Sequence, residues 1–448
     1  MRLFIYTLLL NNLTHLHTPH TTSYANQQGF DGGRLYFDGC AMIVVNGEVR
    51  AQGSQFSVRD VDVVIANVDV DAIRSYRASI SSRSDQASEA TSIERIAVDF
   101  SLGIETSFSN MTTPPVRLRV HKPEEEIGLG PACWLWDYVR RSGAGGFFLP
   151  LSGGADSAST CAIVGIMCHL VVDAVQKGDR KVLEDVRRVT RQTENDLKNL
   201  KRRADKAKSD LKAARNEKEK AYASERIVKA EALAKALDLN YKPSDPREFC
   251  RRIMHTAYMG TENSGNVTRT RAIRIANQIG TFHMDCKVDD IIQGVDLAYC
   301  KTADIVDKLD VVGGMPKDKS PGFKNEKRMC WMEDLAKQNI QARSRMIYSY
   351  KLAQMLATPA VRDKGFLLVL GSANVDEAIY GYYTKYDCSA ADLNPIGGVC
   401  KTDLKLFLKW AGRTYKWPSL LETERAPPSA ELRPGEENQT DEDDMKLT

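Results

Sequence analysis

The chain has 448 residues, of which 42% are hydrophobic, and its 62 basic and 59 acidic residues leave a net charge of +3. Because an ordinary domain has about 100–200 residues, two or three domains are expected. The near balance of charge lacks the broad positive field of a dedicated nucleic-acid binder. Composition therefore favours small-molecule chemistry and predicts no nucleic-acid partner.

The N-terminal residues and the cysteines bear on the compartment. Ten cysteines are scattered without a Cys-x-x-Cys pair, which is typical of reduced thiols rather than of disulfides or a zinc site. Residues 1–22 are left unassigned, because the run MRLFIYTLLLNN resembles a signal peptide only weakly. No apolar stretch approaches the roughly 20 residues of a membrane span. We therefore expect a cytoplasmic protein with no membrane partner.

The first part of the chain is rich in strand patterns. Residues 34–56 carry β-rich runs on both sides of Asn46-Gly47, which is a strong hairpin signal. Residues 61–73, VDVVIANVDVDAI, continue the β-rich pattern. The Ser-rich stretch 79–92 is predicted to be a polar linker.

Helix and strand patterns alternate from residue 124 onward. A helix ending at Gly143 precedes the apolar strand GFFLPL, and a strongly apolar helix follows the loop after it. Much later, the run GFLLVLGSANVDE reads as a buried strand that ends at a Gly-Ser turn. This alternation predicts an α/β fold with a parallel sheet covered by helices.

Residues 181–236 form a densely charged segment that interrupts this alternation. A seam at 3-4 spacing runs through it but is shorter than the three to four heptads of a secure coiled coil. The favoured interpretation is a solvated helical hairpin or long helix inserted into the domain, and a partner-binding coiled coil remains open. The seam consists of Leu197, Leu200, Ala204, Ala207, Leu211 and Ala214.

The sequence LSGGADS, residues 151–157, follows the GFFLP strand run and opens the apolar helix. Glycines there allow a close backbone approach, and the first N–H groups of a helix favour an anion. Ser152 and Ser157 can donate hydroxyl hydrogen bonds, and Asp156 offers a hard oxygen ligand for Mg²⁺. The loop lacks the Lys-Ser/Thr of a Walker A sequence and the Gly-x-Ser-x-Gly of a hydrolase elbow. It is predicted to hold a pyrophosphate with its magnesium.

This loop resembles the Ser-Gly-Gly-x-Asp-Ser loop of the N-type ATP pyrophosphatases, which include GMP, asparagine and NAD synthetases. A second segment, GSANVDEAIYGYYTKYDCSAADLNPIGGVCKTDL, closely resembles NAD synthetase. The segments HKPEEEIGLGPACWLWDYVRRS, MGTENS, QNIQARSRM and KYDC are typical of the eukaryotic glutamine-dependent form. The chain is thus similar to glutamine-dependent NAD(+) synthetases over most of its length.

The resemblance implies a domain organisation. Residues 111–448 would form a Rossmann-like synthetase domain of the adenine nucleotide alpha hydrolase type, with the insert at 181–236. Residues 23–110 would form part of an αββα nitrilase-like glutaminase domain. The resemblance also implies a homo-oligomer.

The resemblance implies a ligase of NAD biosynthesis that forms a C–N bond. Deamido-NAD would be adenylated by ATP with loss of pyrophosphate, and nitrogen from ammonia or glutamine would then displace AMP. Magnesium would be held by Asp156 and Glu377, and deamido-NAD by Arg343, Lys385 and Asp392. The implied ATP contacts are Ser152, Gly153, Gly154, Asp156, Ser157, Ser372, Lys401 and Ser429.

The resembling family makes ammonia with a Glu-Lys-Cys triad that lies upstream of the segment matching residues 24–43. That triad is expected to be missing, so no catalytic residue is assigned and Cys40 is interpreted as structural. The acidic stretch 438–448 is expected to stop short of the family's last basic residues. A C-terminally truncated synthetase domain is therefore expected.

Two alternatives stay open on the sequence. The chain could be another adenylating amidotransferase, such as a GMP synthetase, because the phosphate loop is shared. It could also be an inactive or incomplete chain that binds nucleotide without turnover.

Overall fold

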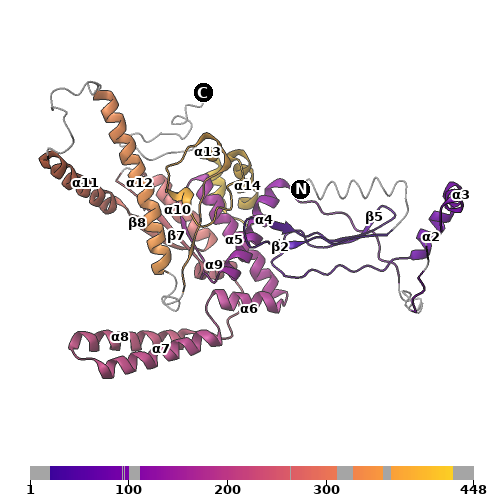
Figure 1. Cartoon of the computed structure of the whole chain (residues 1–448), viewed down its shortest axis with the longest axis horizontal. Coiled ribbons are helices and arrows are strands. Elements are labelled where there is room, and N and C mark those ends of the chain that lie inside the picture. Colours follow the sequence, from indigo (N-terminus) through magenta and orange to yellow (C-terminus); the bar gives the residue numbers. More distant parts are fainter. Residues whose placement is uncertain are drawn as a thin grey trace. The chain divides into compact units, whose positions relative to one another are not determined.

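The computed structural model describes residues 21–92, 94, 96–99, 111–262, 264–309, 326–356 and 365–426. The chain divides into two compact units, Met1–His121 and Lys122–Thr448 (Figure 1). The described part of the first unit consists of short antiparallel strands, the helices α2 (Val70–Ala78) and α3 (Ser81–Glu89) and extended chain, whereas the second combines a parallel sheet with helices.

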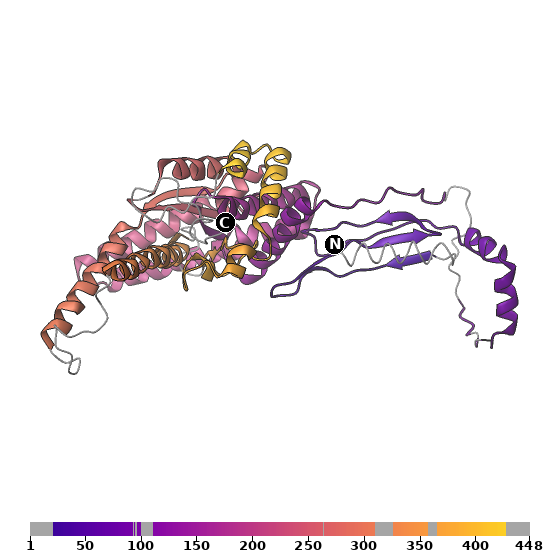
Figure 2. The same ribbon diagram turned by 90° about the horizontal axis from the view of Figure 1, so that it is seen from above.

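The first unit contains two small antiparallel sheets (Figure 2). One has the order β1-β4-β5, and the other pairs β2 with β3. The turn between β4 and β5 has positive φ at both Asn46 (49°) and Gly47 (85°), as a two-residue type I′ hairpin requires. The predicted hairpin is confirmed. The strands are β1 Thr21–Tyr24, β2 Gln28–Phe30, β3 Tyr36–Asp38, β4 Met42–Val45 and β5 Glu48–Gln52.

Two predictions for the first unit are wrong. Residues 61–69 are extended chain outside any strand of the described residues, and helix α2 (Val70–Ala78) follows. This helix starts there because the Asp69 carboxylate accepts hydrogen bonds from two N–H groups of its first turn. The Ser-rich stretch is not a linker throughout, since it forms helix α3 (Ser81–Glu89), which buries no side chain.

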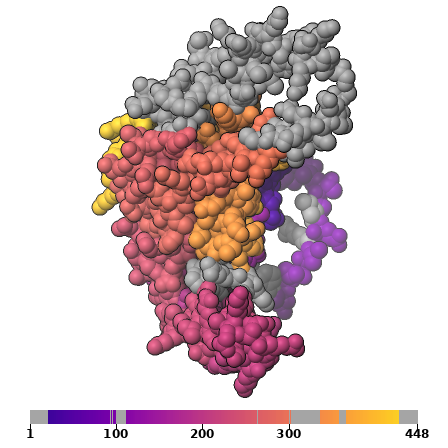
Figure 3. Space-filling model, turned by 90° about the vertical axis from the view of Figure 1, so that its left-hand side faces the viewer, coloured from indigo at the N-terminus to yellow at the C-terminus, as the bar shows by residue number. Residues whose placement is uncertain are grey.

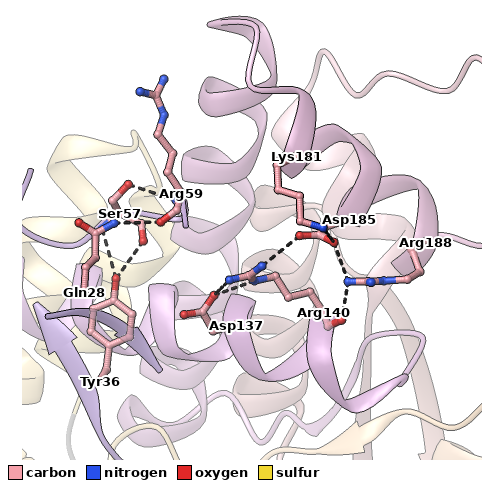
Figure 4. Close-up of polar contacts among 9 residues, drawn as sticks. All are labelled: Gln28, Tyr36, Ser57, Arg59, Asp137, Arg140, Lys181, Asp185 and Arg188. Carbon is pink, nitrogen blue, oxygen red and sulfur yellow. Dashed lines mark hydrogen bonds and ion pairs between the residues drawn. The ribbon is translucent and has the colours of Figure 1, made fainter. Parts of the chain in front are cut away.

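A hydrogen-bonded cluster fastens the turn at residues 57–59 to the β2–β3 hairpin (Figure 4). The Tyr36 hydroxyl donates to the Ser57 carbonyl at 2.9 Å and accepts from the Ser57 N–H at 3.2 Å. The Gln28 amide donates to the Arg59 carbonyl at 2.9 Å. These side chains satisfy backbone groups that no strand ladder serves.

A four-stranded parallel sheet forms the centre of the second unit, in the order β8-β7-β6-β9. The residues Phe147, Phe148 and Leu149 of β6 are fully buried, as expected for a strand covered on both faces. The predicted mixed α/β architecture with a parallel sheet is thus observed. The strands are β6 Phe147–Pro150, β7 Met254–Gly260, β8 Phe282–Lys287 and β9 Leu368–Val369.

Helices surround this sheet and connect its strands (Figure 1). Helix α4 ends at Gly143, which adopts the left-handed conformation, as the sequence predicts. The helices of the second unit are α4 Pro123–Ser142, α5 Ala155–Gln176, α6 Arg180–Val189, α7 Glu194–Ala213, α8 Glu217–Ala236, α9 Pro246–Ile253, α10 Asn266–Ile279, α11 Asp289–Leu309, α12 Glu326–Leu356, α13 Val375–Tyr380, the 3₁₀ turn η1 Cys388–Ala390, α14 Lys401–Thr414 and α15 Pro418–Arg425.

Helix α5 corrects the expectation that no apolar stretch reaches membrane-spanning length. Its 22 residues are long and apolar enough by length and composition, but 83% of its most apolar window is buried in the structure. Helices α4, α6, α9 and α14 pack against it. The core helix of a covered parallel sheet needs this composition, so the helix is weak evidence for a membrane span.

The charged insert is smaller than the sequence boundaries suggest. Helix α6 buries Val182, Val186 and Val189 against the body of the unit, so it belongs to the packed domain. Only α7 and α8 form the hairpin, which projects from this unit in Figures 1 and 3. Its inner face buries three residues of the predicted seam on α7 and two alanines of α8, and ion pairs join its two helices. The buried residues are Leu200, Ala204, Ala207, Ala223 and Ala230, and the pairs are Lys208–Glu231 and Arg226–Asp210.

The buried His255 is expected to make the stability of the protein sensitive to acid. It lies on β7 with its ring against Phe282, and Nδ1 has no hydrogen-bond partner among the described residues. Burial lowers the pKa of His255 from 6.5 to about 4. The unfolded chain therefore binds more protons between these values, and we expect the free energy of unfolding to fall as the pH drops through this window, by up to ~3 kcal/mol. Urea unfolding from pH 7 to pH 4 measures this slope. A His255→Gln variant should flatten it, and an equal slope in both proteins would contradict the assignment.

Candidate active site

The predicted phosphate loop joins β6 to α5. Gly154 is the N-cap of α5, and as a glycine it supplies no capping side chain. The hydroxyls of Ser152 and Ser157 lie 3.0 Å apart, and the Gly154 N–H donates to Ser152 Oγ at 3.3 Å. These residues and Asp156 line one cavity. The loop therefore presents hydroxyls and the positive end of a 22-residue helix to that cavity.

Gly153 is required by the backbone of this loop. Its φ is +85°, in the region that side chains avoid, and a Cβ atom there would lie 2.5 Å from the carbonyl oxygen of Thr268. At Gly154 the nearest atom to an added Cβ would be Ser152 Oγ at 3.4 Å, an ordinary contact. Of these two positions only residue 153 must be glycine in this structure, because helix α10 packs directly against it.

The sheet order brings a second loop beside the first. After β6 the chain adds β7 and β8 on one side of it, whereas β9 pairs on the other side. The carboxyl ends of β6 and β9 therefore flank a topological switch point, where open α/β sheets bind ligands. Thr160 of α5 donates to the Gly371 carbonyl at 3.3 Å and thereby joins the helix after the first loop to the second loop. Ser372, predicted as an ATP contact, lines the same cavity as the phosphate loop.

The two predicted magnesium ligands converge on one side chain. Asn374 Nδ2 lies 2.9 Å from Asp156 Oδ1 and 3.2 Å from Glu377 Oε1. Asp376 accepts from the Lys401 N–H at 2.8 Å, which joins α13 to α14. Two carboxylates on separate elements, Asp156 on α5 and Glu377 on α13, are thus held at one point of the cavity wall.

This carboxylate pair fits magnesium. No group of three or more potential protein ligands converges within the described residues. Mg²⁺ usually takes one or two carboxylates and completes its shell with substrate phosphates and water. A hard oxygen pair beside an anion-binding loop is such a donor set.

Three cationic side chains line the cavity, which has a volume of about 250 Å³. Lys401 was predicted from the sequence, whereas Arg271 and Lys405 were not. Lys405 follows Lys401 by one helical turn of α14, and this spacing could have revealed it. Arg271 donates to the Gly153 carbonyl at 3.3 Å and reaches the loop only because α10 packs there. The cations can spread negative charge over a leaving group.

A second cavity of about 370 Å³ adjoins the first and shares Ser152, Gly154, Ser372 and Glu377 with it. It extends along β7, where Tyr258 and Arg345 contribute to its lining. Arg345 donates to the Met259 carbonyl at 3.1 Å and is thereby fixed. Because both cavities share these residues, the phosphate loop borders both of them, as is expected of a site that binds two substrates.

The three residues predicted to bind deamido-NAD are absent from the linings of the two cavities as far as the structure describes them. Arg343 Nε donates to the Lys385 carbonyl at 2.9 Å, so these two residues do lie together. Asp392 accepts from the Val369 N–H at 2.9 Å and from the Tyr350 hydroxyl at 3.1 Å. Burial raises the pKa of Tyr350 to about 12, and the nearby charge of Asp392 adds to this increase.

Two further candidates remain. Ser429 lies outside the described residues. Cys40 is 1% exposed and accepts a hydrogen bond from Gln52 Nε2 at 3.3 Å. Burial raises the pKa of its thiol, whereas an activated nucleophile needs a lowered one. Its surroundings are those of a structural residue of the first unit.

Known proteins resemble this chain closely in sequence. The NAD synthase family model matches residues 254–448. Proteins named glutamine-dependent NAD(+) synthetase are 45% identical in Arabidopsis thaliana and 42% identical in Homo sapiens, each over 95% of this chain. The alignments cover 50% and 52% of those proteins, so the chain spans about half the length of the curated relatives it matches.

Solved structures share the fold. A glutamine-dependent NAD(+) synthetase from Cytophaga hutchinsonii aligns with a TM-score of 0.51 at 20% identity, over 96% of this chain and 53% of that one. The enzyme of the same name from Acinetobacter baumannii, in complex with ADP, aligns with a TM-score of 0.52 at 17% identity, over 95% and 51%. At such identities the likeness concerns the fold alone.

Proposed function

This chain is a homologue of the glutamine-dependent NAD(+) synthetases, and on that premise we propose that it amidates deamido-NAD to NAD at the expense of ATP. A single observation supports this most: the phosphate loop, the Asp156 and Glu377 carboxylates and three cations meet in one cavity at the switch point of the sheet. A ligase that adenylates its substrate needs these groups together.

The first proposed step forms the adenylate. The nicotinate carboxylate of deamido-NAD attacks the α-phosphorus of ATP, a P–O bond forms, and pyrophosphate leaves with the electron pair of the broken P–O bond. The α5 N-terminus and the loop hydroxyls bind phosphate oxygens, while Arg271, Lys401 and Lys405 face the charge that develops on pyrophosphate. Asp156 and Glu377 would hold Mg²⁺, which neutralises phosphate charge when bound.

The second proposed step forms the amide. Ammonia attacks the acyl carbon of the adenylate, AMP leaves with the acyl oxygen, and a proton is lost from nitrogen. Arg343, Lys385 and Asp392 are proposed to bind deamido-NAD, and Arg343 and Lys385 supply positive charge for its phosphates. Ser372 is proposed to contact ATP from the cavity wall, and the same role is proposed for Ser429.

Further assignments extend the proposal beyond the reaction. The relatives' name makes glutamine the proposed nitrogen source in the whole protein. We propose that residues 111–448 form a synthetase domain of the adenine nucleotide alpha hydrolase type, and that residues 23–110 are part of a nitrilase-like domain. A homo-oligomer in the cytoplasm is also proposed. The GMP synthetase alternative is not favoured, because the sequence relatives are NAD(+) synthetases.

The proposal predicts that the purified protein forms NAD and AMP from deamido-NAD, Mg²⁺-ATP and ammonium. Ammonium is used because it feeds the synthetase step directly. Asp156→Asn should lower this rate by at least about 100-fold, since it weakens a magnesium ligand beside the phosphates. Chromatography of the nucleotides over time measures both products.

The control is Asp173→Asn, on the same helix but half exposed and paired with Lys177. It should keep the wild-type rate within twofold. Xanthylate in place of deamido-NAD should give no amidated product. Absence of NAD at every ammonium concentration, with ATP still bound, would reject the proposal in favour of a chain that only binds nucleotide.

A further inference from the structure

Asn374 occupies an unusual place between the two candidate magnesium ligands. It is 1% exposed and lies at the N-cap of α13. Its Oδ1 accepts from the N–H groups of Asp376 at 3.0 Å and Glu377 at 3.1 Å. Its Nδ2 faces Asp156 Oδ1 at 2.9 Å and Glu377 Oε1 at 3.2 Å.

The orientation of this amide is decided by its partners. Two backbone donors require the oxygen end on the helix side, so the NH₂ end must face the carboxylates. The amide then supplies both of its N–H donors to two acidic side chains, one on each side of the switch point. Like charges that converge in a cavity wall repel, and the shared donor offsets this repulsion.

Capping alone does not account for asparagine here. Serine and aspartate cap helices as well as asparagine does, because only a side-chain oxygen is needed. The NH₂ group has a separate use, which is the contact with Asp156 and Glu377. An amide nitrogen that donates both hydrogens is no ligand for Mg²⁺, so Asn374 holds the ligands and does not join them.

We propose that Asn374 is the positioning residue of the magnesium site, which brings the Asp156 and Glu377 carboxylates together before the metal arrives. The inference deepens the proposed function and rests on it for the identity of the metal and nucleotide. It assigns the NH₂ donor, rather than the cap, as the feature that sets metal affinity. Groups that orient metal ligands in this way typically change metal affinity 10- to 100-fold when they are removed.

The test measures metal binding without turnover. Mn²⁺ is titrated into the protein with α,β-methylene-ATP, followed by electron paramagnetic resonance, and deamido-NAD is left out. Asn374→Ser keeps a capping oxygen and removes the donor, so the dissociation constant for Mn²⁺ should rise about 10-fold. Affinity for the analogue without divalent metal should stay within twofold of wild type.

The control is Asn216→Ser, because Asn216 caps α8 with Oδ1 and contacts Glu219 with Nδ2 far from the site. It should leave Mn²⁺ binding unchanged. Asn374→Asp keeps the cap and replaces the donor with a third carboxylate, so its melting temperature should fall without metal and recover with saturating Mg²⁺ and the analogue.

The results separate this proposal from the proposed function. An Mn²⁺ affinity of Asn374→Ser within twofold of wild type would overturn it, as would a wild-type protein that binds no Mn²⁺ with the analogue. If Asn374→Ser does not fold, an Asn374→Asp melting temperature that Mg²⁺ fails to restore overturns it equally. A protein that binds Mn²⁺ as expected but makes no NAD would reject only the proposed function.

Discussion

Replacing Gly153 with alanine is expected to lower the proposed formation of NAD by about 100-fold or more. The new Cβ would lie 2.5 Å from the Thr268 carbonyl oxygen and 3.1 Å from the Ala272 N atom. Both are backbone atoms of α10, so neither can rotate away. The loop or the helix must shift, and a displacement of about 1 Å near reacting groups lowers rates by about 10².

Stability should change less than activity in this variant. A non-glycine residue at φ +85° is strained by about 1–3 kcal/mol, provided the loop keeps its conformation. Thermal unfolding and the steady-state rate with ammonium measure the two effects on the same protein. The expected result is a folded protein with a misplaced phosphate loop.

Gly178→Ala is the matched control. Gly178 follows the other end of α5 and has φ +88°, and no atom of the described residues lies within 4 Å of an added Cβ. It carries the same backbone strain without the collision and lies outside both cavity linings. The variant should lose about 1–2 kcal/mol of stability and keep its activity. Equal activity losses in both variants would show that strain, and not the contact with α10, matters.

Replacing Asp185 with alanine is expected to lower the free energy of unfolding by about 3–5 kcal/mol. Asp185 is the centre of a buried charge network between α4 and α6 (Figure 4). The side chains of Asp185 and Arg140 are 2% and 6% exposed, and their closest atoms are 3.1 Å apart. Arg188 and Lys181 approach the same carboxylate at 2.6 Å and 3.5 Å.

The size of this effect follows from desolvation. Arg140 would keep Asp137, 2.6 Å away, but one arm of its buried guanidinium would lose its carboxylate. A buried charge left without its partner is far less stable than the same charge in water. Urea unfolding followed by circular dichroism measures the loss.

Asp173→Ala provides the comparison on the surface. Asp173 pairs with Lys177 at 2.6 Å, but these side chains are 56% and 62% exposed. Exposed pairs contribute about 0–1 kcal/mol, because water and salt screen them. If Asp185→Ala were no more destabilising than Asp173→Ala, the network would not hold α6 to the domain.

The sequence by itself determined features whose residues are adjacent along the chain. The phosphate loop at 152–157 combines glycines, hydroxyls and an acid at a helix start. The Asn46-Gly47 turn requires positive φ at both residues, which this residue pair favours. The apolar strands β6 and β9 were predicted for the same reason, since burial on both faces needs continuous apolar runs. Lys401 and Glu377 were predicted from a long sequence motif, and both line the cavity.

Only the tertiary structure decided which distant residues meet. The pairing of β9 beside β6 brings Asn374 to Asp156, which lies 218 residues away, and the packing of α10 on Gly153 brings Arg271 to the loop. The sequence of α6 is charged like that of the α7–α8 hairpin, and only its buried side chains show that it belongs to the packed domain. The physical reason is that local conformation depends on neighbours along the chain, whereas a site depends on sheet order and on which charges share a buried space.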